Sequence, residues 1–64
     1  MGESFAIAFA KARKEQGATQ EDAADLLDVS IGTIRNYEQG RTLPLAPIRR
    51  LIFEKFPSLS TKVR

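Results

Sequence analysis

The stretch TQEDAADLLDVSIGTIRNYEQG, residues 19–40, decides the fold of this chain. Apolar residues recur at helical intervals in each half of the stretch: Ala23 and Ala24 lie four and three residues before Leu27, and Ile34 lies three residues before Tyr37. Such intervals place side chains on one face of an α-helix. The pattern therefore predicts two short amphipathic helices, at about residues 20–27 and 31–38.

Local signals mark the ends of these two helices. Thr19 is a favourable N-cap, and Asp22 follows three residues later as the acidic member of a capping box. Asp28 occupies the break between the helices, where a tight turn needs a left-handed residue; aspartate tolerates that conformation at some cost. Ser30 is expected to cap the second helix and Gly40 to end it. A short turn would then hold the two helices at a fixed angle.

The second helix is expected to bury Ile34 and to expose polar and basic side chains. Its predicted outer face holds Gly32, Thr33, Arg35 and Asn36. A helix with such a face, set at an angle by a short turn, has the shape needed to enter a DNA major groove.

Charge is distributed unevenly along the chain, although its net value is only +2. Residues 1–34 hold three basic and six acidic side chains, a balance of −3. Residues 35–64 hold seven basic and two acidic side chains, a balance of +5. The positive half begins on the second helix of the pair, which favours a polyanionic partner there over ordinary surface charge.

Composition narrows the class of protein. A chain of 64 residues forms one small domain, and it contains no cysteine and no histidine. We therefore predict no catalytic residue, no metal site and no cofactor, and no small-molecule site is evident. The apolar stretch at residues 5–10 is too short to span a bilayer, no signal peptide is apparent, and a cytoplasmic location is expected.

Two further helices are predicted, at about residues 3–16 and 46–55. The loop between residues 40 and 46 should be ordered, with Leu43 directed inward. Pro57 disfavours helix at the preceding residue, so the last predicted helix should end near Lys55 and leave a short turn or tail.

A set of residues across positions 5–52 matches a known pattern in identity and spacing: Arg13, Thr19, Gln20, Ala24, Val29, Ser30, Ile34, Tyr37, Glu38, Gly40, Leu43 and Pro44. In this combination the chain resembles the Cro/C1-type (XRE-like) helix-turn-helix repressors of phages and bacteria. The resemblance implies an all-α, lambda-repressor-like DNA-binding domain, a compact bundle of four to five helices.

The resemblance also implies which residues contact double-stranded DNA: Gln20, Ser30, Ile31, Gly32, Thr33, Arg35, Asn36, Arg41 and Thr42. Gln20 would contact a phosphate and brace the second helix of the motif. Arg41 and Thr42 would hold the DNA backbone. Ile31 and Gly32 depart from the usual pattern, because neither can donate a side-chain hydrogen bond to a base. Ile31 can pack on a thymine methyl, and Gly32 either lets the backbone approach DNA or is a helix-start residue with little role.

Two other features follow from the resemblance. Arg13 and Glu38 match positions that form a structural ion pair, expected to contribute under ~1 kcal/mol if partly exposed. Members often dimerise through a longer fifth helix than this sequence offers. Phe53, Phe56 and Leu59, followed by Val63, could build a dimer contact instead. Alternatively, Phe56 and Leu59 fold back to close the core of the monomer.

These features predict a Cro-like transcriptional regulator, a repressor that binds a pseudo-palindromic operator as a homodimer, formed either in solution or only on DNA. It would act in the cytoplasm or nucleoid of a bacterial host cell. The alternative is an antitoxin-like or other protein-interaction module that binds DNA only secondarily. That alternative draws on an apolar set, Ile7, Leu26, Phe53 and Phe56.

Overall fold

A computed structural model describes residues 4–62, which form five α-helices and no strand. The bounds are Phe5–Glu15 for α1, Gln20–Leu27 for α2, Ile31–Gln39 for α3, Ala46–Lys55 for α4 and Pro57–Lys62 for α5. The predicted start of the first helix at residue 3 lies outside the described residues, as does Val63. The all-helical class expected from the sequence is confirmed.

Capping side chains fix the starts of α1 and α2. The Ser4 hydroxyl accepts a hydrogen bond from the backbone N–H of Ile7, 3.3 Å away. Thr19 and Asp22 form a reciprocal capping box with two bonds of 3.0 Å. Each of these bonds satisfies a backbone N–H that has no partner inside its helix.

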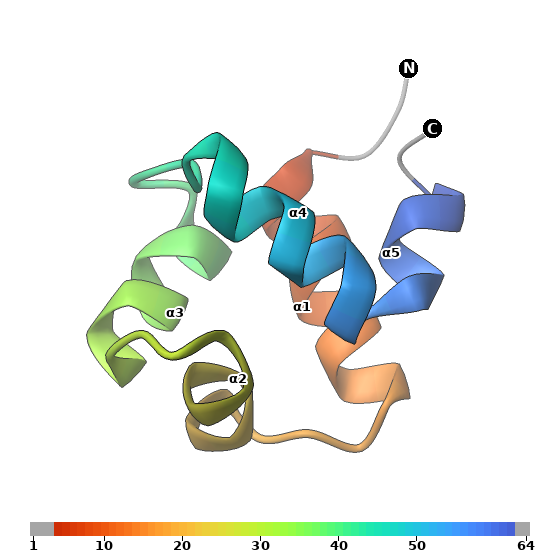
Figure 1. Cartoon of the computed structure of the whole chain (residues 1–64), viewed down its shortest axis with the longest axis horizontal. Coiled ribbons are helices and arrows are strands. Elements are labelled where there is room, and N and C mark those ends of the chain that lie inside the picture. The colour runs from red at the N-terminus through yellow and green to blue at the C-terminus, as the bar shows by residue number, and fades with distance from the viewer. Residues whose placement is uncertain (1–3, 63–64) are drawn as a thin grey trace.

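The turn between α2 and α3 has the conformation that the sequence indicated. Asp28 is left-handed, with φ 57° and ψ 45°, and it is the only non-glycine residue with positive φ in the described chain. Ser30 then caps α3, and Gly40 ends that helix with φ 76°. The chain thus turns within three residues, which sets α3 at an angle to α2 (Figure 1).

The core is centred on Phe9 of α1, which is fully buried. Its ring stacks on Phe5 at 5.7 Å and meets Tyr37 and Phe56 edge-on at 6.2 and 5.6 Å. Aromatic pairs prefer these offset and edge-on arrangements. Because the partners come from different parts of the chain, Phe9 joins α1 to α3 and to the segment before α5.

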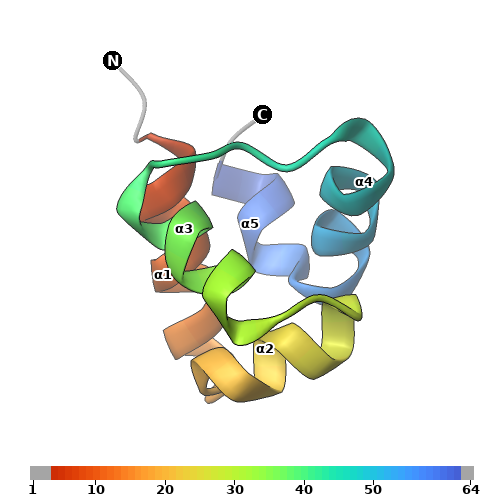
Figure 2. The same cartoon turned by 90° about the vertical axis from the view of Figure 1, so that its left-hand side faces the viewer.

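The C-terminal segment corrects one prediction. A turn or tail was expected after Lys55, but residues 57–62 form the helix α5, which packs on α1 and α4. Pro57 does end α4, yet it is also the first residue of α5, where a missing N–H costs nothing and the fixed φ favours a helix. In Figures 1 and 2, α5 lies on the opposite side of the molecule from α3.

Candidate nucleic-acid interface

Helix α3 is anchored by its apolar face. Ile34 is fully buried and Tyr37 is 6% exposed. The Tyr37 ring meets Phe5 edge-on at 6.5 Å and Phe9 at 6.2 Å, and burial raises the pKa of its hydroxyl above the ordinary value. With this face fixed against α1, the opposite face of α3 is turned away from the core, toward the viewer in Figure 2.

The outer face of α3 is polar and carries unpaired positive charge. Gly32 and Arg35 are exposed, whereas Thr33 and Asn36 are half-buried. Arg35 has no ion-pair partner among residues 4–62. An arginine without a protein partner keeps its full fork of donors available to a phosphate or a guanine. This face can therefore serve both electrostatic attraction and hydrogen bonding.

Two hydroxyl groups meet at the start of α3. The Ser30 Oγ accepts the backbone N–H of Thr33 at 3.1 Å and lies 2.9 Å from the Thr33 Oγ1. Only one of the two hydroxyl groups donates its hydrogen within this pair, so the hydrogen of the second hydroxyl stays available. The start of the helix thus presents one hydroxyl donor from a pair whose positions are already fixed.

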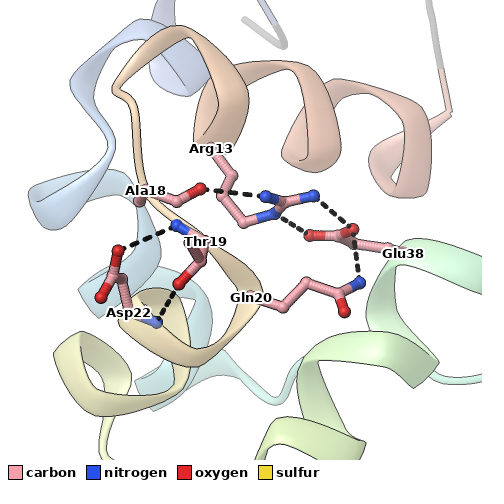
Figure 3. A network of polar contacts seen from close by, with 6 residues as sticks. All are labelled: Arg13, Ala18, Thr19, Gln20, Asp22 and Glu38. Atoms are coloured by element: carbon pink, nitrogen blue, oxygen red, sulfur yellow. Dashed lines mark hydrogen bonds and ion pairs between the residues drawn. The ribbon is translucent and has the colours of Figure 1, made fainter.

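Glu38 is the centre of a polar cluster that joins three helices (Figure 3). Its carboxylate accepts two bonds from Arg13 of α1, Nε to Oε2 at 2.6 Å and Nη2 to Oε1 at 3.1 Å. Gln20 of α2 donates a third bond from Nε2 to Oε1 at 3.1 Å. Arg13 also donates from Nη1 to the carbonyl of Ala18, 2.9 Å away. The cluster fixes the angle of α3 relative to α1 and α2.

Burial of the Arg13–Glu38 pair changes the energy expected for it. Both side chains are only about a tenth exposed, 10% and 9%. The expected contribution of under ~1 kcal/mol to stability holds for a partly exposed ion pair. In a buried pair, removing one partner leaves the other charge buried and unpaired, and the domain loses far more stability. Gln20 braces α3 through Glu38, as the resemblance implied. Its contact with a phosphate stays a prediction.

The first turn of α3 contains the two residues that depart from the usual pattern. Ile31 is half-buried and packs against the core, so only part of its side chain is available to a thymine methyl. Gly32 is exposed, and its φ is not positive. A Cβ added there would meet only the Ser30 Oγ, at an ordinary contact distance of 3.7 Å. The fold therefore does not require glycine at this position.

The loop after α3 places Arg41 and Thr42 at the surface, beside the end of the helix. It also corrects the expectation for Leu43, which is 72% exposed, while Pro44 is buried in its place. Neighbouring residues of an extended segment point to opposite sides, so burial of Pro44 turns Leu43 outward. Alternation around Pro44 was the signal available in the sequence.

A family comparison agrees with this geometry. A family model described as helix-turn-helix matches residues 9–52, which span α2, α3 and the loop that follows. The chain belongs to the Cro/C1-type helix-turn-helix family. Neither the curated proteins nor the solved structures gave a match. Membership in this family of DNA-binding regulators supports sequence-specific binding to double-stranded DNA.

The structure decides between the two roles considered for the apolar residues of the C-terminal segment. Phe56 and Leu59 are both fully buried in the core of the single chain, so the fold-back alternative holds and the dimer role of these two residues is wrong. Phe53 is half-buried and keeps part of its ring at the surface. The aromatic packing of Phe9 on Phe56 is the physical reason for the difference.

No helix within residues 4–62 has the length and apolar character needed to cross a membrane. Families of this helix-turn-helix type bind DNA and are typically without enzymatic activity.

Proposed function

We propose that the protein is a transcriptional repressor that inserts α3 into the major groove of a pseudo-palindromic operator and binds there as a homodimer. Arg35 and Asn36 would face the base edges, and Arg41 and Thr42 would hold the backbone. An operator-bound domain represses by occupying DNA that overlaps a promoter, which requires no further chemistry. Two copies would occupy half-sites about one helical turn, ~34 Å, apart.

The observation that carries this proposal is the two-sidedness of α3. Ile34 and Tyr37 hold one face against the core, while Gly32 and Arg35 are exposed on the other. The Glu38 cluster fixes the angle of the helix through α1 and α2. A recognition helix needs both a rigid mounting and an uncovered polar face, because base readout depends on the position of each donor.

Charge supports the same assignment. Arg35 and Arg41 are exposed and have no ion-pair partner among residues 4–62, so both can contact phosphates at no cost in internal pairing. If about six phosphates are neutralised, affinity should fall roughly a thousandfold between ~50 and ~200 mM salt. Binding that does not change over this range would contradict the proposal.

Selection of binding sites from random duplex DNA tests the proposal most directly. We expect a recovered sequence with two inverted half-sites, centred about ten base pairs apart. Footprinting on the selected site should then protect both halves. Recovery of unrelated sequences with no common element would overturn sequence-specific binding, and a single unrepeated element would overturn the dimer.

The alternative of a protein-interaction module loses one of its four supporting residues. Phe56 is buried, whereas Ile7 and Leu26 are exposed at 55% and 39% and Phe53 is half-buried. Purification of the tagged chain from its host would decide between the two functions. A partner protein at fixed stoichiometry, together with loss of DNA binding in its presence, would favour the alternative.

A further inference from the structure

A shallow groove, called the α4 groove below, runs along the exposed side of α4. It has a volume of about 200 Å³ and is lined by Ala46, Arg49, Arg50 and Phe53. Intervals of three and four between these positions place them on one face of the helix, apart from the face that buries Ile52. None of the lining residues belongs to the set proposed to contact DNA, so the groove is a surface feature that the proposed function does not use.

Both arginines of the α4 groove carry charge that the domain does not neutralise. Arg49 and Arg50 are exposed and have no ion-pair partner within residues 4–62. Glu54, the single acidic residue of α4, is also exposed and makes no ion pair with either of them. Two neighbouring guanidinium groups present forks of N–H donors that match the geometry of carboxylates. The groove is therefore complementary to a ligand with more than one anionic group.

The α4 groove also has an apolar component. Phe53 is half-buried and its ring lines the groove, and Ala46 is exposed. Leu45, directly before Ala46, is 77% exposed and makes no capping hydrogen bond at the start of α4. A leucine at that position stabilises neither the core nor the helix start. A ligand that fits this surface therefore carries apolar side chains next to its anionic groups.

Such a lining is typical of contacts between proteins. Protein interfaces are enriched in arginine and aromatic residues and depleted in lysine, and the groove holds two arginines, a phenylalanine and no lysine. A DNA phosphate has no apolar part that could cover Phe53 or Leu45. Pockets that enclose small molecules usually reach ~300–1,000 Å³, which exceeds the volume of this groove. A peptide segment with acidic and apolar side chains meets both requirements.

We infer that the α4 groove binds an acidic peptide segment of a partner protein, whose carboxylates pair with Arg49 and Arg50 while a neighbouring apolar side chain covers Phe53. The inference goes beyond the proposed function, because a partner can dock on α4 whether or not α3 holds DNA. Exposed ion pairs are individually weak and the groove is small, so binding through the groove alone is transient and weakens as salt screens the charges.

Selection from a displayed library of random peptides, with the full chain immobilised, supplies the probe. We expect the recovered peptides to combine aspartate or glutamate with leucine or an aromatic residue. Fluorescence anisotropy of the strongest recovered peptide then gives its affinity for the chain at low salt. Recovery of no peptide, or of peptides without acidic residues, would overturn the inference.

Arg49→Gln/Arg50→Gln removes both charges of the α4 groove. The matched control is Lys14→Gln/Lys55→Gln, which removes two exposed charges outside the groove and leaves the same net charge. All four side chains are exposed, so both variants should fold, which circular dichroism verifies. Peptide affinity should fall about fivefold or more in the groove variant and change little in the control. Equal losses in both variants would show attraction by net charge alone and would overturn the site.

Ala46→Glu tests the same groove without removing an arginine. A glutamate at the first position of α4 suits the helix N-terminus and reaches Arg49 and Arg50, three and four residues later. It should therefore preserve the fold and compete with the carboxylates of the peptide, which weakens peptide binding. Ala46→Gln fills the same space without charge and should weaken binding less. Equal peptide affinities of these two variants would overturn the pairing of carboxylates with the arginines.

Two further measurements on Arg49→Gln/Arg50→Gln identify other occupants of the groove. Sedimentation of the chain without peptide detects self-association, and titration with random duplex DNA detects phosphate contacts. We expect the groove variant to match the lysine control in both. A dimer that is present in the parent and lost only in the groove variant would assign the groove to a second copy. A selective loss of DNA affinity as large as the loss of peptide affinity would assign it to phosphates. Either result would overturn the inference.

Discussion

Arg13 and Glu38 are 25 residues apart in sequence, yet two hydrogen bonds of 2.6 and 3.1 Å join the guanidinium of α1 to the carboxylate of α3. Both side chains are about nine-tenths buried. The same carboxylate holds the Gln20 amide at 3.1 Å, so one charge fixes three helices. The orientation of the recognition helix therefore depends on an interaction outside the DNA-facing surface.

Glu38→Gln should destabilise the domain by about 3 kcal/mol, because it leaves the buried guanidinium without a counter-charge. Urea unfolding followed by circular dichroism measures this. The double variant Arg13→Met/Glu38→Leu is the control, since it removes both charges and should be more stable than Glu38→Gln. If the double variant is the less stable of the two, the burial penalty is not the cause.

Local sequence signals are sufficient to predict the motif that α2, the turn and α3 form. The capping box at Thr19, the left-handed Asp28 and the cap at Ser30 each act within a few residues, so the sequence contains the interaction in full. The Arg13–Glu38 pair is not local, and composition or periodicity could not find it. It was expected only because the resemblance placed both residues in a known pattern.

The sequence was insufficient where packing decides between two uses of an apolar residue. Phe56 and Leu59 suited either a dimer contact or the core, and only the position of Phe9 relative to Phe56 resolves the choice. Pro57 disfavours helix at the residue before it, but it also begins α5. The sequence predicts that Leu43 points inward, but Pro44 fills the buried position of this loop and Leu43 is exposed.

Leu59→Ala should destabilise the single chain by about 2–5 kcal/mol, because it opens a cavity in a fully buried site. The denaturation midpoint should not depend on protein concentration. A midpoint that rises with concentration in the parent but not in the variant would mean that Leu59 contributes to an interface. The concentration series therefore separates core packing from dimerisation.

Gly32→Ala should raise the free energy of unfolding by up to about 0.5–1 kcal/mol, since alanine favours the helix and meets only the Ser30 Oγ. Binding to the selected site should weaken, because the added methyl lies on the exposed face of α3. Gly40→Ala is the control with the opposite expected sign: at a φ of +76°, alanine should lower the free energy of unfolding by about 1 kcal/mol. Unchanged DNA affinity for Gly32→Ala would mean that Gly32 is only a helix-start residue.

Stability should fall at alkaline pH through Tyr37. Burial raises the pKa of its hydroxyl above the ordinary value of 10.0, so the unfolded chain releases the proton first. The stability linked to this group is complete below pH 10 and is lost as pH rises through the higher pKa of the folded chain. Tyr37 is the only tyrosine, so tyrosinate absorbance follows it directly. Tyr37→Phe should show a smaller alkaline loss of melting temperature; an identical loss would assign the effect to other groups.

Base reading and backbone binding should separate between Asn36 of α3 and Arg41 of the following loop. Asn36→Ala removes a side chain that can make two hydrogen bonds to adenine, so we expect a loss of about 1–3 kcal/mol at one base pair of the selected site. The affinity of the Asn36→Ala variant for random DNA should change little. Arg41→Ala removes a phosphate contact and should weaken selected and random duplexes by the same factor.

Titrations of both variants at several salt concentrations distinguish the two roles. Arg41→Ala should lower the slope of log affinity against log salt by about one unit, because one fewer counterion is released, whereas Asn36→Ala should leave that slope unchanged. Asn36 is half-buried on the outer face of α3 and Arg41 is exposed, so neither substitution should unfold the domain. Equal effects of the two changes on specific and random DNA, with equal slopes, would show that readout lies elsewhere on α3.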